Sequence, residues 1–306
     1  MTDTPQRIAI IGGGLMGAGI AQVFAAAGHR VTVHEPVAEV RETVRARIAA
    51  NLAALEQDPA PAENVAVAGE LAAAVADAQF VFEAAPEKLP LKQSIFAALA
   101  KHAPPGAILA SNTSVIPITD IVHGLETASR MAGTHWWNPP YLVPLVEVVQ
   151  TAQTAPQTVA ALMALLKAVG KAPVHVKKDV PGFVANRLQH ALWREAIAIV
   201  AAGICDAETV DTCVKQSFGL RLPVLGPLEN ADLVGLDLTL DIHNVILPAI
   251  DNSPAPSPLL QELVEKGDLG FKTGKGFRAW SAEDMANLRA RLTAHLKRAL
   301  SGSETA

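Results

Sequence analysis

The sequence contains few cysteines and few aromatic residues. Among its 306 residues there are two cysteines, Cys205 and Cys213, and aromatic residues make up 4% of the chain. The two cysteines lie eight positions apart and form no CxxC pair, so they make neither a disulfide framework nor a cysteine set for a metal. We therefore expect reduced thiols, no metal site and a cytoplasmic location.

Strong charge of one sign and long apolar runs are missing as well. The chain has 25 Lys and Arg against 30 Asp and Glu, a net charge of −5, whereas nucleic-acid-binding proteins carry clustered basic residues. No apolar run is long enough to predict a membrane-spanning helix. The N-terminal MTDTPQR lacks the apolar segment of a signal peptide. Neither a nucleic acid nor a membrane is an expected partner.

The first half of the chain contains a regular alternation of strand-like and helix-like segments. Short β-branched runs alternate with longer segments of helical periodicity, which is typical of a mostly parallel sheet covered by helices on both faces. The predicted strands span 7–11, 31–35, 65–68, 80–84, 107–111, 131–135, 145–149 and 173–176, and the predicted helices span 15–27, 37–56, 92–101 and 157–168. This pattern predicts an α/β fold, a doubly wound sheet of the Rossmann type.

The pattern changes at KKDVPGF (177–183). Beyond it strand signals nearly vanish, and a long predicted helix over 183–202 ends at Gly203. Asp206 is then a predicted N-cap for the helix that carries the two cysteines. We expect two domains: an α/β domain over residues 1–180 and an all-helical domain over residues 181–306.

A glycine-rich loop follows the first predicted strand and leads directly into a helix. In IAIIGGGLMGAGIAQ the spacing Gly-x-Gly-x-x-Gly allows a tight turn, a close approach of backbone amides to a pyrophosphate, and close packing of helix on strand. Glu35 ends the second predicted strand, where a carboxylate accepts hydrogen bonds from both ribose hydroxyls and repels a 2′-phosphate. The pattern predicts NAD rather than NADP. The predicted contacts in this loop are Gly12, Gly14, Leu15, Met16 and Gly17.

The segment THWWNPPYLVPLVE (134–147) contains two of the chain's four tryptophans beside a histidine. His135 lies at the end of a predicted strand, and Glu147 lies twelve residues later. An intervening loop with three prolines would bring the two side chains together, with the carboxylate orienting the imidazole as a general base. Such a pair removes a proton from an alcohol while hydride leaves its carbon, although a structural His–Glu pair has the same spacing.

Several longer stretches carry a family resemblance that covers nearly the whole chain. They are GGGLMGAGIAQVFAAAG, FEAAPEKLPLKQSIF, ASNTSV, GTHWWNPP…LVE, DVPGFVANRL and FKTGKGF. Together these motifs resemble those of the L-3-hydroxyacyl-CoA dehydrogenase family. The resemblance implies oxidation of the 3-hydroxyl of a 3-hydroxyacyl-CoA to the ketone in fatty acid metabolism, with NAD as the hydride acceptor.

The resemblance also implies site residues. His135 and Glu147 match the family's catalytic pair, and Ser114, Asn138 and Asn186 match residues that hold the substrate and polarise its 3-oxygen. On the cofactor side, the matching residues are Ala85, Glu87, Lys92 and Asn112. The family further implies that the second domain contacts the substrate and forms a homodimer.

Two departures from the family pattern concern the substrate. Most members have Phe-Phe where this chain has Trp136-Trp137, and bulkier rings beside the base are expected to narrow the pocket. The stretch between the second and third predicted strands is shorter than in acyl-CoA enzymes, where it forms a projecting helical hairpin that helps to hold CoA. The NPPYLVPLVE and NRLQ…EA forms resemble relatives that act on free small hydroxy acids: L-gulonate 3-dehydrogenase (lambda-crystallin), carnitine dehydrogenase and the pyridine-carboxylate dehydrogenase of vitamin B6 breakdown.

The substrate class therefore stays open between a CoA thioester and a free hydroxy acid, hydroxymethyl or aldehyde compound. Three arginines, Arg41, Arg45 and Arg47, are candidates for a phosphate contact, but nearby glutamates favour a solvated helix face. Relatives of 6-phosphogluconate dehydrogenase are a weaker match, because the chain lacks their catalytic GxxxKxxxN lysine. A non-enzymatic NAD-binding structural or sensor protein is a remote alternative.

Overall fold

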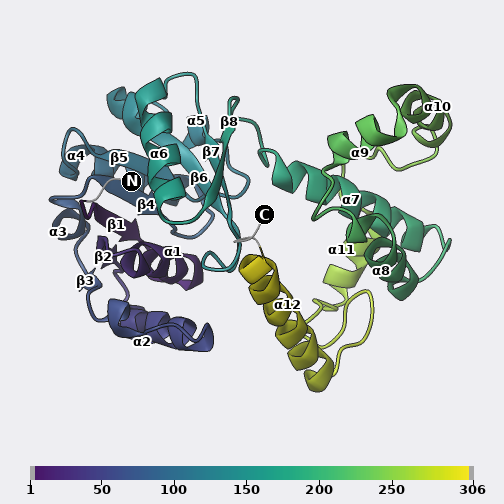
Figure 1. The fold of residues 1–306 in the computed structure, drawn as a ribbon, viewed down its shortest axis with the longest axis horizontal. Coiled ribbons are helices and arrows are strands. Elements are labelled where there is room, and N and C mark those ends of the chain that lie inside the picture. Colours follow the sequence, from purple (N-terminus) through teal and green to yellow (C-terminus); the bar gives the residue numbers. More distant parts are fainter. Residues whose placement is uncertain (1–3, 303–306) are drawn as a thin grey trace. The chain divides into compact units, whose positions relative to one another are not determined.

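The computed structural model describes residues 4–302 and divides into two compact units. The first unit contains the chain up to Asn186 and from His295 onward, and the second contains Arg187–Ala294. The first unit is a sheet covered by helices, and the second is helical (Figure 1). The predicted boundary at residue 180 separates a cofactor-binding domain from a substrate-binding domain, and this assignment of roles stays a prediction.

One eight-stranded sheet forms the centre of the first unit, in the order β3-β2-β1-β4-β5-β6-β7-β8. All neighbouring strands are parallel except β6 and β7, which are antiparallel. All eight predicted strands are confirmed. They are β1 (Arg7–Ile11), β2 (Arg30–His34), β3 (Ala66–Ala68), β4 (Phe80–Glu83), β5 (Ile108–Ser111), β6 (Met131–Trp136), β7 (Leu145–Val149) and β8 (Ala172–Val176).

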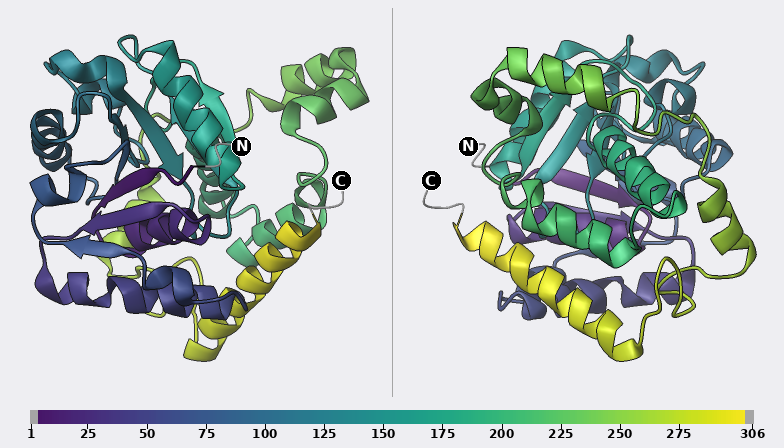
Figure 2. Two further views of the ribbon diagram at one scale, coloured as in Figure 1. Left: turned by 60° about the vertical axis from the view of Figure 1, so that its left-hand side comes forward. Right: turned by 90° about the vertical axis from the view of Figure 1, so that its right-hand side faces the viewer.

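Helices cover both faces of this sheet, as Figure 2 also shows. One face buries an apolar cluster under α1 (Leu15–Ala26), α2 (Ala38–Ala54) and α6 (Pro156–Ala168). The other buries a second cluster under α3 (Leu71–Val75), α4 (Leu89–His102) and α5 (Ile118–Ile121). Burial on both faces explains why central strands such as RIAII and FVFE are almost continuously apolar.

The predicted helices are confirmed, with small shifts at their ends. The helix predicted from residue 92 begins at Leu89, because Pro90 occupies the first turn, where its missing amide hydrogen costs nothing. The short helices α3 and α5 were not predicted, since five and four residues are too few for a clear period.

The second unit contains helices α8 to α11 entirely, together with most of α7 and the first part of α12. Asp206 caps α8, as predicted, by accepting a hydrogen bond from the amide of Thr209 at 2.8 Å. Both cysteines are free thiols. The helices are α7 (Ala185–Ala201), α8 (Ala207–Gln216), α9 (Pro227–Val234), α10 (Leu236–Ile246), α11 (Pro258–Glu265) and α12 (Ala282–Gly302). Within residues 4–302, no helix has the length and apolarity needed to cross a membrane.

The strand order places a ligand edge at the carboxyl ends of the parallel strands. The chain leaves β1 toward β2 on one side and returns to β4 on the other, and open α/β sheets bind ligands at such a switch point. The antiparallel strand β7 starts at this same edge, beside the end of β6. Residues at the ends of several strands therefore converge there.

Candidate active site and cofactor site

His135 and Glu147 form a buried pair across the antiparallel ladder of β6 and β7. They are register partners, and the imidazole Nδ1 lies 2.7 Å from the Glu147 Oε2. An ionised carboxylate only accepts hydrogen bonds, so Nδ1 carries the hydrogen and Nε2 is left as the basic nitrogen. The predicted pairing is therefore present, and its cause is strand register in addition to the proline loop.

The second oxygen of Glu147 accepts hydrogen bonds from two backbone amides at the start of α7. Val184 and Ala185 donate to Oε1 at 2.9 and 3.0 Å. Burial by itself raises the pKa of Glu147, but His135 and these two amides outweigh it and hold the pKa below its usual value. The carboxylate thus stays charged at neutral pH, and its stabilising contribution is lost as the pH falls through the lowered pKa.

Two aromatic rings flank the His135 imidazole. Trp137 and Phe183 have ring centroids 5.2 and 5.8 Å from it. Phe183 is buried and has a φ of 49°, a left-handed conformation that is unusual for a non-glycine residue. This turn directs the next two amides at Glu147 while the ring packs on the imidazole. The DVPGF motif did not by itself indicate a role for Phe183.

Two of the three predicted substrate residues, Ser114 and Asn138, lie on loops, and Asn186 lies in the first turn of α7. Asn186 donates from Nδ2 to the backbone oxygen of Ser114 at 2.9 Å, which joins these two residues directly. Ser114 is exposed, and its hydroxyl makes no hydrogen bond to the described part of the chain. Asn138 is exposed and follows Trp137 at the end of β6, before a cis peptide bond to Pro139. Their contacts with substrate stay predictions.

The glycine loop has the shape that a dinucleotide requires. Gly12 has a φ of +104°, and a Cβ on Gly17 would lie 1.8 Å from the Gly12 carbonyl oxygen, so neither position accepts a side chain. A Cβ on Gly14 would meet no atom within 4 Å, which marks open space at the N-terminus of α1. No side chain caps that helix, so its first amides are available to a pyrophosphate. Leu15 is exposed beside this space.

Glu35 lies beside the loop, as predicted. Its Oε2 accepts a hydrogen bond from the amide of Gly13 at 2.8 Å, and Oε1 accepts one from Val37 at 3.0 Å. Met16, in contrast, is partly buried and packs against the apolar core. The loop, the free helix N-terminus and the acid together fit NAD.

Lys92 is buried and pairs with the carboxylate of Glu83, a residue for which the sequence motifs had indicated no role. Its Nζ lies 2.8 and 3.0 Å from the two oxygens of Glu83, and both side chains are at most 1% exposed. Ser111 donates to the same carboxylate at 2.6 Å, and the amide of Ala85 donates at 2.7 Å. Glu83 was detectable as an acid at the carboxyl end of a buried strand next to the glycine loop.

Glu87 holds the loop that contains Ser114. Its Oε1 accepts hydrogen bonds from the Thr113 hydroxyl at 2.6 Å and from the Ser114 amide at 2.9 Å. Burial raises the pKa of Glu87, but Thr113, Lys92 and loop amides lower it by more. Asn112 joins β5 to β6, because its Oδ1 accepts from the amide of Trp136 at 2.9 Å. These contacts place Glu87, Lys92 and Asn112 at the cofactor edge, where their cofactor roles stay predictions.

The expectation that both tryptophans narrow the pocket is wrong for Trp136. Successive residues of a strand point to opposite faces, so Trp136 points away from His135 and into the core. It is 2% exposed and packs edge-on against Phe24 and Phe82 at 5.8 and 6.1 Å. Only Trp137 lies beside the base.

The arginines of α2 lie at the surface, as predicted, with Arg45 exposed and Arg41 and Arg47 half-buried, but they are not free in solvent. Each guanidinium binds a backbone carbonyl oxygen instead: Arg41 that of Glu35, and Arg47 that of Gly13, at 2.9 and 2.7 Å. Arg45 binds the carbonyl of Val65 at 2.7 Å. The arginines therefore attach α2 to the segments around the glycine loop, which a helical charge pattern alone does not indicate.

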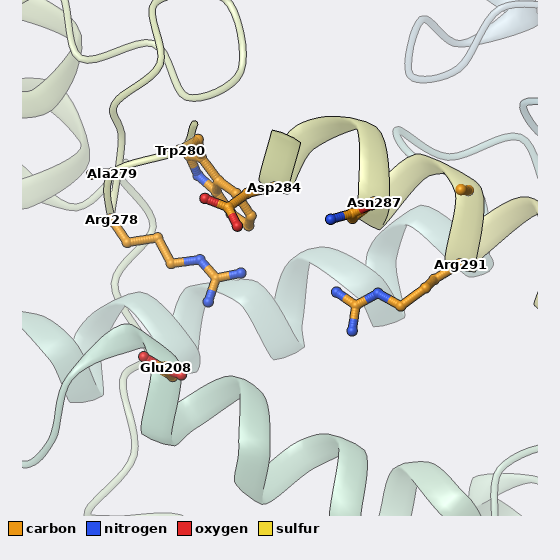
Figure 3. Close-up of a pocket in the computed structure, with 8 residues that line it drawn as sticks. Glu208, Arg278, Ala279, Trp280, Asp284, Asn287 and Arg291 are labelled. Atoms are coloured by element: carbon orange, nitrogen blue, oxygen red, sulfur yellow. The ribbon is translucent and has the colours of Figure 1, made fainter. Parts of the chain in front are cut away.

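A cavity of about 710 Å³ in the second unit contains none of the predicted site residues. Arg278 and Arg291 point into it from two sides, and Arg278 stacks on Trp280 with 3.9 Å from its guanidinium carbon to the ring centroid (Figure 3). Glu208 and Asp284 also line it and balance the two positive charges. The predicted site residues lie instead around His135 and along the glycine loop.

Comparison with known proteins matches both parts of the chain to one family. The model of the 3-hydroxyacyl-CoA dehydrogenase NAD-binding domain matches residues 7–180, and the model of the family's C-terminal domain matches residues 182–280. Helix α12 follows the second matched region.

Individual relatives cover much of the chain. It is 34% identical over 307 residues to 5-formyl-3-hydroxy-2-methylpyridine 4-carboxylate 5-dehydrogenase of Mesorhizobium japonicum, covering 98% of this chain and 99% of the relative. A crystal structure of such an enzyme, described as an NAD⁺-dependent dismutase, has a TM-score of 0.91 at 33% identity, with 99% of both chains covered. L-Carnitine dehydrogenase of Streptomyces griseus is 42% identical over 234 residues, covering 75% of this chain and 70% of the relative.

Proposed function

The chain belongs to the 3-hydroxyacyl-CoA dehydrogenase family of NAD-dependent oxidoreductases acting on CH–OH groups, and from this premise we propose that its substrate is a small hydroxy compound with a free carboxylate. In the proposed reaction, the carbon that is oxidised bears the hydroxyl of this small compound or belongs to a hydrated aldehyde. It does not belong to a 3-hydroxyacyl-CoA thioester.

The segment between β2 and β3 is the main support for a free substrate. It consists of the single helix α2, a 3₁₀ turn at Ala60–Ala62 and a direct return to β3. That turn contributes the buried Ala62 to the same apolar cluster as α1 and α2, so the segment follows the domain surface. The projecting hairpin that would help to hold a CoA nucleotide has no counterpart within the described residues. The end-to-end likeness to a pyridine-carboxylate dehydrogenase supports the same choice.

The proposed mechanism uses His135 as the general base. Its Nε2 takes the hydroxyl proton as hydride leaves the adjacent carbon, and Glu147 stabilises the resulting imidazolium from Nδ1. Bound NAD supplies the hydride acceptor. Trp137 and Phe183 pack beside the ring, which is 4% exposed and therefore largely shielded from water. Ser114, Asn138 and Asn186 are the proposed donors to the substrate oxygens.

A substrate comparison tests this proposal. Wild-type enzyme with NAD is assayed for NADH formation on L-carnitine, free 3-hydroxy acids, pyridine carboxylates bearing hydroxymethyl or formyl groups, and 3-hydroxybutyryl-CoA. We expect kcat/KM for one of the free compounds to exceed that of the thioester by about hundredfold or more. NADP should be a poor acceptor, because Glu35 repels its 2′-phosphate.

The opposite ranking would favour the second candidate, a 3-hydroxyacyl-CoA dehydrogenase of fatty acid metabolism, for which the family is named. Tight NAD binding without turnover of any compound would favour the remote alternative, a sensor. The cytoplasmic location stays a prediction.

The second unit supports a proposed homodimer. None of its described side chains is buried, and Val224, Leu228 and Val245 are 82%, 80% and 77% exposed. A helical domain with so much apolar surface needs a covering partner. We propose that a second copy of the chain covers it.

Light scattering after gel filtration tests the dimer. Wild-type protein should have twice the mass of one chain, and the Val245→Asp variant should shift to one chain, because a charge in an apolar interface is costly to bury. The matched control is Asp241→Asn, on the same helix α10, which removes no apolar contact and should leave the mass unchanged. A monomeric wild type would contradict the proposal.

A further inference from the structure

The segment 137–144 connects the strand that carries His135 to the strand that carries Glu147, and it contains Asn138. It forms one helical turn, in which the amides of Leu142 and Val143 both donate to the carbonyl of Pro139. We call it the catalytic loop. Its position relative to β6 and β7 decides where Asn138 lies with respect to the base.

Lys171 holds this loop from a different element. It follows Gly170, which has a φ of +76° and ends the turn after α6, and it immediately precedes β8. Its Nζ donates to the carbonyl oxygen of Pro140 and, at 3.1 Å, to that of Val143. The same ammonium lies 5.7 Å from the centroid of the Trp136 ring. The Lys171 side chain therefore connects two carbonyl groups of the catalytic loop to the Trp136 ring, which lies in the apolar core.

Within residues 4–302, no carboxylate pairs with this ammonium. Lys171 makes no ion pair with the described residues, and its charge is stabilised by carbonyl dipoles and the indole face. It lines a cavity of about 330 Å³ together with Tyr141, Leu142 and Pro144 of the loop, in which Tyr141 is the other titratable group. Burial raises the pKa of Tyr141, so its hydroxyl stays neutral, and burial lowers the pKa of Lys171 to about 8.

The other side of the loop is also closely packed. A Cβ on Gly19 of α1 would lie 2.9 Å from the Pro140 Cδ, so the proline ring lies directly on that helix. The amide of Ala172 donates to the carbonyl of Pro144 at 2.9 Å, next to Lys171. The loop is thus held at its middle by the ammonium and at its end by the backbone of β8.

We propose that Lys171 is a positioning residue: its ammonium holds the catalytic loop, and therefore Asn138, in the geometry that binds the hydroxy substrate. The proposal rests on the proposed function only in that Asn138 faces the substrate. It assigns a role to Trp136 as well, since the indole supplies the surface on which the ammonium is placed.

A pH dependence follows from the missing counter-charge. When Lys171 loses its proton, two charge-assisted hydrogen bonds become weaker neutral ones, and the loop loosens. Folding lowers the pKa of Lys171 to about 8, so above this pH the unfolded chain keeps the Lys171 proton more often than the folded chain does. The free energy of unfolding therefore increases with pH in this range. A loss of substrate affinity above about pH 8 without a loss of thermal stability is therefore its signature.

The first test compares Lys171→Met with Lys167→Met, which removes an exposed lysine from the last turn of α6. We expect Lys171→Met to raise KM for the hydroxy substrate about tenfold, with kcat reduced less than about threefold and KM for NAD unchanged. Lys167→Met should match wild type. Equal KM values in Lys171→Met and wild type would overturn the proposal.

The second test uses Lys171→Arg, whose guanidinium stays charged across the accessible pH range. In wild type, kcat/KM for the hydroxy substrate should fall above about pH 8, and in Lys171→Arg this alkaline decline should disappear. An arginine variant that folds and keeps the decline would contradict the proposed titration.

A third measurement is independent of turnover. Hydrogen exchange at the amides of Leu142, Val143 and Ala172 should be faster in Lys171→Met than in Lys167→Met at neutral pH, and faster in wild type at pH 9 beyond the intrinsic pH effect. If exchange is faster in Lys171→Met but the wild-type protein oxidises none of the substrates, the proposed function fails and the loop-holding role of Lys171 stands. Unchanged exchange would overturn the loop-holding role even in an active enzyme.

Discussion

Replacing His135 with glutamine is expected to lower kcat by about 10²–10⁴-fold, the range that general-base catalysis typically contributes. Glutamine keeps a hydrogen-bond donor toward Glu147 but has no basic nitrogen to take the hydroxyl proton. The two aromatic side chains beside the imidazole, Trp137 and Phe183, have no basic group that could replace it. Steady-state NADH formation on the best substrate is the measurement.

The matched control is His123→Gln, at an exposed histidine in the segment after α5. It should retain wild-type turnover, and both variants should bind NAD with wild-type affinity, because neither residue belongs to the glycine loop. A kcat for His135→Gln within tenfold of wild type would assign the proton transfer to another group. The buried charge of Glu147 would then serve only to hold the start of α7, through the two backbone amides that donate to it.

Replacing Lys92 with methionine is expected to destabilise the first unit by about 3–5 kcal/mol, because it leaves the buried Glu83 carboxylate without its counter-charge. Glu83 is fully buried and Lys92 is 1% exposed, so water does not replace the lost partner. Ser111 and Ala85 supply two remaining hydrogen bonds, which are too few to offset a buried charge. Urea denaturation followed by circular dichroism measures the change.

Two further variants separate charge from packing. Lys101→Met removes an exposed lysine from the last turn of the same helix α4 and should change stability by less than about 0.5 kcal/mol. The double variant Glu83→Gln/Lys92→Met carries no buried charge and should recover part of the loss. If Lys92→Met alone cost less than about 1 kcal/mol, the pair would not have the structural role that its burial indicates.

Local sequence patterns predict most of the first unit. Eight apolar runs correspond to eight strands, and the glycine loop correctly marks the turn from β1 to α1, because these features depend on neighbouring residues only. Contacts between distant segments were not predicted. The arginines of α2 form the predicted surface face, but they also bind carbonyls of the segment after β2, the glycine loop and the segment before β3.

The site divides in the same way. His135 and Glu147 were found because the types of residue and the proline loop between them suggest a base and its partner. Glu83 and Phe183 were not assigned a role, because their importance comes from Lys92 and from the amides at the start of α7, which lie in other segments. Strand alternation would have placed Trp136 correctly, since His135 and its neighbour in one strand face opposite ways.

By itself, the sequence determined the α/β class, the cofactor loop with Glu35, and the identity of the His–Glu pair, since each depends on the spacing of residues that are close in the sequence. Only the tertiary structure decided that β7 runs antiparallel to β6, which places Glu147 directly opposite His135. It alone decided that Lys171 holds the loop between them. Strand direction and a lysine's contacts depend on which surfaces are buried together, and burial is a property of the folded chain rather than of any one segment.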